Sequence, residues 1–231
     1  RQPALAASGE SDPTVSTIAF IGLGIMGGPM SRHLVKAGHR VIGFNRSPGP
    51  MEQLVADGGK GAGSVAEAVH QADLIITIVP DSPDVESLAL GEGGIYANAP
   101  RGSIHIDMSS IRPDVATRLA DAGKAAGIRV MDAPVSGGET GAIEGALSIM
   151  VGANPADWCW WGPPGSGQTV KAANQLIVAG TLELVAEAIV FLRAYGVDTQ
   201  AAVSVLAGGL AGSRVLERKA ASMLAGTFQP G

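Results

Sequence analysis

Cysteine is almost absent from the sequence, because Cys159 is the only one in 231 residues. A single cysteine excludes an internal disulfide, and we expect a cytoplasmic protein in a reducing environment. The net charge is -5 and no basic run occurs, so neither nucleic acid nor an anionic membrane is an expected partner. The four histidines lack a spacing with acids or with Cys159 that is typical of a metal site, so no metal is expected.

Long apolar runs without charge are also missing. The longest expected apolar helix, Val170 to Leu192, contains Glu183 and Glu187, which favours a buried helix over a membrane-spanning one. Residues 1–16 mix Pro, Ser, Gly and Asp without an apolar run, which predicts a disordered tail and no signal peptide.

Glycine, in contrast, is abundant, and three of the 33 glycines follow an apolar run in an ordered pattern. Ile18–Ile21 is typical of a buried parallel strand, and Gly22, Gly24 and Gly27 then have the G-x-G-x-x-G spacing of a dinucleotide site. The first glycine permits a tight turn, and the second lets the backbone approach a pyrophosphate. The third lets the next helix, about Met26 to Ala37, pack close to the strand. A glycine-rich turn without a ligand is the alternative, but the flanking strand and helix favour a dinucleotide.

The turn after the second expected strand, His39 to Phe44, indicates which dinucleotide binds. Folds that prefer NAD usually place Asp or Glu about 20 residues after the glycines, whereas an Arg there accommodates a 2′-phosphate. This turn carries Asn45, Arg46 and Ser47, with no acid before Glu52. We therefore predict NADP(H) as the favoured cofactor and NAD(H) as the alternative, in which Arg46 is an ordinary solvated turn residue.

Strands and helices alternate along the first two-thirds of the chain, which predicts the α/β class with a doubly wound, Rossmann-like, mostly parallel sheet. The expected strands are 18–21, 39–44, 73–79, 103–107 and 128–132, and the expected helices are 26–37, 51–56, 64–70, 83–90 and 113–126. Val79 and Pro80 end a strand where the sheet should line the cofactor crevice. We place the dinucleotide-binding domain at residues 17–164 and a helical domain at 165–231.

Two stretches at strand ends, Asp107–Ser110 and Asp132–Glu139, are rich in small hydroxyl and glycine residues. Hydroxyls and free N–H groups in a crevice suit a carboxylate or a carboxamide. A plain strand-to-helix turn is the alternative for either stretch.

Lys171, Asn174 and Gln175 fall on one face of the long apolar helix that follows Gly165. A lysine near the start of such a helix is expected to be partly desolvated, which lowers its pKa and suits a general acid or base. The alternative is a solvated lysine whose stem lies along the apolar surface.

Three motifs, Gly22-Leu23-Gly24-Ile25-Met26-Gly27, Asp132–Gly138 and Gly165–Gln175, resemble in their order and spacing the β-hydroxyacid dehydrogenase family. This family includes 3-hydroxyisobutyrate dehydrogenase and 6-phosphogluconate dehydrogenase. Three segments are most similar in sequence to the tartronate semialdehyde (2-hydroxy-3-oxopropionate) reductases of the family. They are Asp132–Glu139, Lys171–Gln175 and Gly208–Ser213. The resemblance covers the chain from about Thr17 onward.

The resemblance implies a role for each matching residue. Lys171 matches the catalytic lysine, which protonates the aldehyde oxygen as hydride arrives from the nicotinamide. Ser136, Gly137 and Gly138 match the loop that holds the substrate carboxylate, and Asn174 or Gln175 would supply a supporting amide. Ser110 matches a hydroxyl residue near the nicotinamide. The predicted cofactor-binding residues are Gly22, Leu23, Gly24, Ile25, Met26, Gly27, Asn45, Arg46, Ser47, Val79, Pro80 and Ser110.

The implied activity is NAD(P)H-dependent reduction of 2-hydroxy-3-oxopropionate to glycerate, with Lys171 as general acid/base. Within the same class, 3-hydroxyisobutyrate dehydrogenase or a related short hydroxyacid dehydrogenase is the alternative. From another class, a non-catalytic NADP-binding interaction module is the alternative. The expected partners are a small hydroxyacid or semialdehyde substrate and a second copy of the chain, bound through the C-terminal helices.

Two departures from the family are expected to matter. Between Gly152 and Gly162 the family has a helix and a strand, which at average lengths need roughly 16 residues. This chain offers only 153–161, with all three tryptophans at 158–161, so we expect a connector shortened by a deletion, a gene-model or frame error, or an abnormal splice. The chain also ends at Gly231, where the family's helical domain continues through a Lys-Asp motif, so we expect a truncated helical domain.

Overall fold

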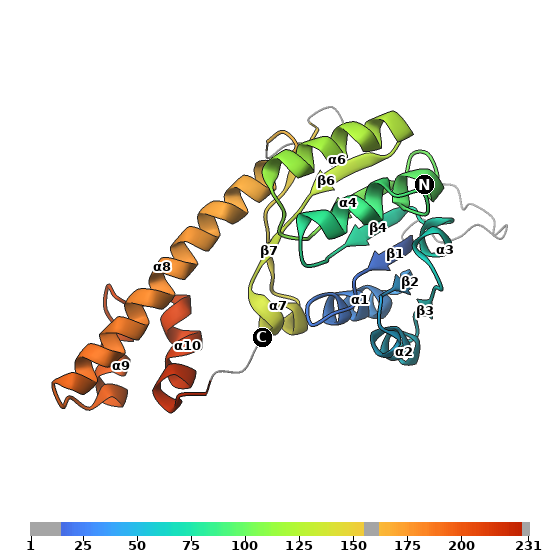
Figure 1. Ribbon diagram of the computed structural model, residues 1–231. Coiled ribbons are helices and arrows are strands. Elements are labelled where there is room, and N and C mark those ends of the chain that lie inside the picture. The colour runs from blue at the N-terminus through green and yellow to red at the C-terminus, as the bar shows by residue number, and fades with distance from the viewer. Residues whose placement is uncertain (1–14, 155–161, 228–231) are drawn as a thin grey trace, which may run out of the picture. The chain divides into compact units, whose positions relative to one another are not determined.

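The computed structural model describes residues 15–154 and 162–227 (Figure 1). The Trp-rich connector and the tail before Val15 lie outside the described residues. The chain divides into two compact units, with the boundary after Lys171, and each unit is described by itself.

The first unit is built on a mostly parallel sheet, as predicted (Figure 1). Among the described residues its strand order is β3-β2-β1-β4-β5-β6-β9, in which only β9 pairs antiparallel to its neighbour. The strands are β1 (Thr17–Ile21), β2 (Arg40–Phe44), β3 (Lys60–Gly61), β4 (Leu74–Thr77), β5 (Ile104–Asp107), β6 (Arg129–Asp132) and β9 (Gly152–Ala153). Because β1 lies between β2 and β4, the glycine pattern that follows it reaches the sheet's carboxyl edge inside the sheet and not at its margin.

Both faces of β1 are buried, as expected for a strand covered by helices on two sides. Ile18 and Phe20 pack with apolar residues of α1 and α2, whereas Ala19 and Ile21 pack with those of α3 and α5. The helices of this unit are α1 (Gly27–Lys36), α2 (Pro48–Ala56), α3 (Val65–Val69), α4 (Ser82–Leu90), α5 (Ile95–Asn98), α6 (Pro113–Ala126) and α7 (Gly138–Glu144). The core therefore holds the central strands rigidly beneath the predicted site.

A small hairpin projects from the end of β6. It consists of β7 (Val135–Ser136) and β8 (Ser148–Ile149), which pair antiparallel, and α7 connects the two strands. The sequence did not predict this hairpin or α7. The hairpin fixes the predicted substrate loop at one end through main-chain hydrogen bonds.

The second unit is helical. It contains most of α8 (Ser166–Ala194), together with α9 (Thr199–Ala207) and α10 (Arg214–Ala225). Ser213 caps α10, because its Oγ accepts a hydrogen bond from the Leu216 N–H at 3.1 Å. The buried apolar core of the unit consists of Val185, Ile189, Val203, Leu216 and Ala220.

The prediction that the long apolar helix is buried is wrong for the described residues. Helices α9 and α10 cover only the stripe of α8 that carries Val185 and Ile189, and elsewhere Leu176 (77% exposed), Ile177 (69%) and Leu184 (67%) face solvent. By length and mean hydropathy (1.9), α8 could cross a membrane, but a core helix of a soluble protein meets the same two criteria. The expectation that the chain has no membrane partner stays a prediction.

Candidate active site

A cavity of about 600 Å³ opens at the carboxyl ends of β1, β2 and β4. Residues from the glycine loop, from the turn after β2 and from the segment after β4 line it together. The predicted cofactor-binding residues in its lining are Gly22, Gly24, Ile25, Met26, Gly27, Asn45, Arg46, Ser47, Val79 and Pro80. Leu23 and Ser110, which were predicted with them, are not in the lining.

Each glycine of the pattern meets a different steric demand. Gly22 has φ +96°, and a Cβ there would lie 2.2 Å from the Ile78 carbonyl oxygen. A Cβ on Gly27 would lie 1.9 Å from the Gly22 carbonyl oxygen, so only glycine lets α1 pack this close to β1. A Cβ on Gly24 would meet nothing within 4 Å. The open side of Gly24 is therefore where a ligand can approach the backbone, which fits the space that a pyrophosphate needs.

The start of α1 also fits a pyrophosphate. None of the hydrogen bonds found among residues 15–154 and 162–227 uses the backbone N–H of Ile25 or Met26. Unpaired N–H groups at a helix N-terminus bind anions, and the helix dipole adds to the attraction.

Leu23 and Asn45, two of the predicted cofactor residues, form hydrogen bonds that support the glycine loop. The Leu23 N–H donates to Asn45 Oδ1 at 3.0 Å, and Asn45 Nδ2 donates to the Ser47 carbonyl oxygen at 3.1 Å. Asn45 therefore ties the end of β2 to the glycine loop, a role that the sequence pattern did not reveal.

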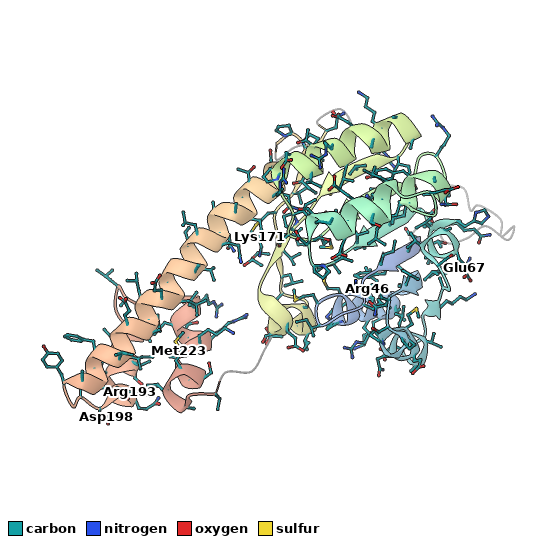
Figure 2. All side chains as sticks on the ribbon, viewed as in Figure 1. Arg46, Glu67, Lys171, Arg193, Asp198 and Met223 are labelled. Atoms are coloured by element: carbon teal, nitrogen blue, oxygen red, sulfur yellow. The ribbon has the colours of Figure 1, made fainter. Side chains whose placement is uncertain are left out.

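Arg46 lies on the exposed turn after β2 and lines the cavity (Figure 2). The acid in the lining, Asp84, comes from α4 and not from this turn. The turn thus carries a cation where a carboxylate would hold a ribose 2′-hydroxyl. This arrangement fits the predicted preference for NADP(H), which stays a prediction.

Lys171 lies in the second turn of α8 and is half-buried (Figure 2). Its Nζ donates to the Val135 carbonyl oxygen at 2.6 Å, and Ser136 follows directly in the chain. Burial lowers the pKa of Lys171 below the usual lysine value, as the sequence predicted. The structure therefore brings the predicted acid/base next to the predicted carboxylate loop.

The backbone of that loop depends on two glycines. Gly137 has φ +141° and Gly138 has φ +62°, in the region that favours glycine. A Cβ on Gly137 would also lie 3.0 Å from Leu147 Cδ2, so the loop is close to the β8 side of the hairpin. These constraints turn the chain sharply between β7 and α7 beside Lys171.

Of the two serines after β5, Ser109 forms a hydrogen bond with a residue in the lining of the cofactor cavity. Ser109 is 2% exposed, and its Oγ accepts a hydrogen bond from the Val79 N–H at 3.0 Å. Ser110, which the resemblance places near the nicotinamide, is exposed. Its role stays a prediction.

Beneath the cavity runs a buried polar chain that sequence reasoning missed. Tyr96 Oη contacts His105 Nδ1, His105 Nε2 contacts Thr77 Oγ1, and Thr77 Oγ1 donates to Asp107 Oδ1 at 2.7 Å. Burial lowers the pKa of His105 to about 4 and raises the pKa of Asp107 above its usual range. The Ser109 N–H also donates to Asp107 Oδ1, so the chain ends at the residue that supports Val79.

Asn174 and Gln175 follow Lys171 on α8 and belong to the second unit. Asn174 Nδ2 donates to Gln175 Oε1 at 3.0 Å, so the two amides contact each other. Their predicted role in substrate binding stays a prediction.

Comparisons with known proteins agree with this geometry. Residues 17–163 match the family model described as the NAD binding domain of 6-phosphogluconate dehydrogenase. Residues 165–231 match the model described as NAD-binding of NADP-dependent 3-hydroxyisobutyrate dehydrogenase.

Individual relatives carry different activities. The 2-hydroxy-3-oxopropionate reductase of Escherichia coli K12 is 39% identical over 93% of this chain and 78% of its own length. The 3-hydroxyisobutyrate dehydrogenase of Pseudomonas aeruginosa is also 39% identical, over 74% of this chain and 64% of its own. The solved structure of Mycobacterium tuberculosis 3-hydroxyisobutyrate dehydrogenase with L-serine is 31% identical, with a TM-score of 0.80 over 94% of this chain and 76% of that one. The chain therefore belongs to the 3-hydroxyisobutyrate dehydrogenase-related family of NAD(P)-dependent β-hydroxyacid dehydrogenases.

Proposed function

We propose that the chain reduces 2-hydroxy-3-oxopropionate to glycerate with NADPH. The observation that carries the proposal is the contact of Lys171 Nζ with the Val135 carbonyl oxygen, beside the loop of Ser136 to Gly138. It is supported by the 39% identity to a 2-hydroxy-3-oxopropionate reductase. Family membership itself makes the chain an NAD(P)-dependent oxidoreductase that acts on the CH–OH group of hydroxyacids.

In the proposed reaction, proton transfer and substrate binding are carried out by different residues of the chain. Bound NADPH supplies the hydride that adds to the aldehyde carbon. Lys171 donates a proton to the aldehyde oxygen, so the product forms as an alcohol and not as an alkoxide. A lysine with a lowered pKa suits this step, because its ammonium gives up the proton more readily at neutral pH. Ser136 and the glycines after it hold the substrate carboxylate and so orient the carbonyl.

NADPH is proposed over NADH because of Arg46. Arg46 occupies the position in the turn at which an NAD-preferring fold usually has an acidic residue, and it lines the cavity together with Ser47. An arginine pairs strongly with a phosphate group through parallel N–H donors. The two family models differ on this point, since one is described for NAD and the other for an NADP-dependent enzyme.

The deciding experiment is a substrate panel with both cofactors. We expect the highest kcat/KM for tartronate semialdehyde with NADPH, against lower values for oxidation of 3-hydroxyisobutyrate and L-serine with either oxidised cofactor. If kcat/KM is higher for 3-hydroxyisobutyrate, the proposal is replaced by 3-hydroxyisobutyrate dehydrogenase activity, which is the activity in the name of another relative with 39% identity. Tight NADPH binding without turnover of any of them would instead favour a non-catalytic binding module.

We also propose that the chain self-associates through its C-terminal helices. Leu176, Ile177 and Leu184 of α8 are each more than 60% exposed, and Val205 of α9 is 77% exposed. Apolar side chains this exposed on a folded unit favour an interaction surface. A second copy is the proposed occupant, since related enzymes of the family are expected to associate through these helices.

A further inference from the structure

Gln168 is a buried amide in the first turn of α8, only 2% exposed. Its Nε2 donates to the Ser109 carbonyl oxygen at 2.9 Å, and its Oε1 accepts from the Ile111 N–H at 3.0 Å. These two backbone groups flank Ser110, the residue predicted to lie near the nicotinamide. Gln168 therefore clasps the segment after β5 from both sides.

The backbone of Gln168 is held equally firmly. Its N–H donates to Asp132 Oδ2 at 3.0 Å, and Asp132 Oδ1 accepts from the Gly165 N–H at 2.8 Å. A Cβ on Gly167 would lie 2.3 Å from the Met150 carbonyl oxygen, so this turn packs tightly against the chain beside it. The carboxylate at the end of β6 thus fixes where α8 begins.

Lys171 follows Gln168 by three residues, so the two side chains project from the same face of α8. The Lys171 Nζ lies against the Val135 carbonyl oxygen. The segment after β5 and the segment after β6 are consequently connected through two neighbouring positions of one helix. Any shift of the first turn of α8 would change the distance from Lys171 to the Ser109–Ile111 segment.

We infer that Gln168 is a positioning residue, which sets the place of Lys171 relative to the Ser109–Ile111 segment at which the nicotinamide and substrate meet. The inference rests on the proposed function. Gln168 does not touch the substrate, because both ends of its amide are already bonded to the backbone. Misplacing a reacting group by about 1 Å can reduce the rate on the order of 100-fold, so a clasp of this kind has a measurable effect on kcat.

The contact needs one donor and one acceptor on neighbouring atoms, and the Gln168 amide provides both at every pH. The Ile111 N–H must meet an acceptor and the Ser109 carbonyl must meet a donor, which settles the orientation of the amide. A glutamate at this position has the same shape, but it can donate to the Ser109 carbonyl only when it is protonated. Ionised, it would turn an oxygen toward the carbonyl oxygen and open the clasp.

The experiment is the pH profile of Gln168→Glu in the full chain, with NADPH and tartronate semialdehyde. We expect kcat near the wild-type value at acid pH and a loss on the order of 10- to 100-fold as the new carboxyl ionises, with little change in the KM for NADPH. Burial and the facing carbonyl should place this loss above the usual glutamate pKa of about 4.3. A profile parallel to that of the wild type, or a loss that does not depend on pH, would overturn the inference.

The matched control is Gln200→Glu, which makes the same change at an exposed residue of α9. Its kcat profile should follow the wild type across the whole range. Thermal unfolding of both variants at each pH shows whether the protein remains folded while kcat is lost.

A second variant keeps the inference testable if the buried glutamate prevents folding, or if the wild type turns over no substrate. Gln168→Met has a similar length but neither donor nor acceptor, so kcat should be low at every pH. The reactivity of Lys171 toward an amine-modifying reagent, followed by mass spectrometry against pH, needs no turnover. Its midpoint should rise toward the ordinary lysine value, because Lys171 is no longer held in its desolvated place. An unchanged midpoint would overturn the inference, whereas absent turnover in the wild type would contradict only the proposed function.

Discussion

The two units of the chain bury different kinds of residue. Among the described residues, every buried polar or charged side chain belongs to the first unit: Ser31, Thr77, Ser82, Ser103, His105, Asp107, Ser109, Asp132 and Gln168. The second unit buries only apolar residues and leaves many others exposed. Buried polar groups are costly unless they are bonded, so their positions are tightly specified. The positions in the first unit are therefore fixed by directional hydrogen bonds as well as by packing, whereas the core of the second unit is held by apolar packing.

The location of the polar groups strengthens this contrast. Thr77, Asp107 and Asp132 end neighbouring strands β4, β5 and β6, at the edge where the predicted site lies. Asp107 Oδ1 accepts from the Ser109 N–H, and Ser109 Oγ in turn accepts from the Val79 N–H of the cofactor cavity. Asp132 Oδ2 accepts from the Gln168 N–H at the start of α8. The buried, hydrogen-bonded polar groups at these strand ends thus lie close to the predicted site, where displacement of a loop would affect function most.

The largest effect is expected from Lys171→Ala, which removes the proposed proton donor while leaving the apolar unit intact. General acid catalysis contributes on the order of 10²- to 10⁴-fold, so kcat should fall by that factor. The affinity for NADPH, measured by fluorescence titration, should stay near the wild-type value, because Lys171 is not in the lining of the cofactor cavity. Turnover at the wild-type rate would contradict the proposed mechanism.

The second prediction compares two leucines of the second unit. Leu216 is 4% exposed in the core, so Leu216→Ala should destabilise this unit by about 2 to 5 kcal/mol, seen as faster amide exchange in α9 and α10. Leu176 is 77% exposed, so Leu176→Ala should change monomer stability by no more than about 0.5 kcal/mol.

The Leu176→Ala variant also tests the proposed self-association. Sedimentation should show weaker association for Leu176→Ala, since the exposed face of α8 would lose apolar contact area. If Leu176→Ala associates like the wild type, another surface must join the copies.

The third prediction concerns acid stability of the first unit. Burial lowers the pKa of His105 to about 4 from 6.5, so between these values the unfolded chain takes up a proton that the folded chain does not. Stability is therefore lost as pH falls from 6.5 to 4, by on the order of 3 kcal/mol for this residue. Asp107 acts in the opposite direction, because its raised pKa lets the folded state take up a proton first as pH falls.

The difference between wild type and His105→Gln isolates the histidine contribution. Urea unfolding at pH 7 and pH 4.5 should show a smaller acid loss in the variant than in the wild type. His70→Gln, at an exposed position of the same unit, should keep the wild-type loss. Equal losses in all three proteins would show that His105 titrates normally in the folded state.

The sequence predicted the apolar part of the first unit well, because long apolar segments bounded by glycine or proline encode their own structure. The predicted strands 39–44 and 103–107 correspond to β2 and β5, and the helix predicted at 113–126 is α6. Strands β3 and β9 are only two residues each, too short for a periodic pattern, and they form through pairing with a neighbour.

The candidate site was predictable only where a motif exists. The glycine pattern and Lys171 could be named, because spacing along the chain carries their chemistry. The clasp of Gln168 joins residues 57 and 59 positions apart, so no local pattern reveals it. The exposure of α8 was missed for a related reason. An apolar sequence favours burial of the helix, but it does not say whether the helix is buried within the same chain or against another molecule.

A smaller effect than those of the Leu216 and His105 changes is expected from a pair of glycine variants that separates folding from cofactor binding in the first unit. Gly27→Ala would place a Cβ 1.9 Å from the Gly22 carbonyl oxygen, and overpacking of this kind costs about 1 to 3 kcal/mol of unfolding free energy. Gly24→Ala meets nothing within 4 Å, so its unfolding midpoint should match the wild type. Its new methyl group would instead occupy the space left for the pyrophosphate, and the Kd for NADPH should rise. A Gly24→Ala protein that binds NADPH with unchanged affinity would place the cofactor elsewhere than over this loop.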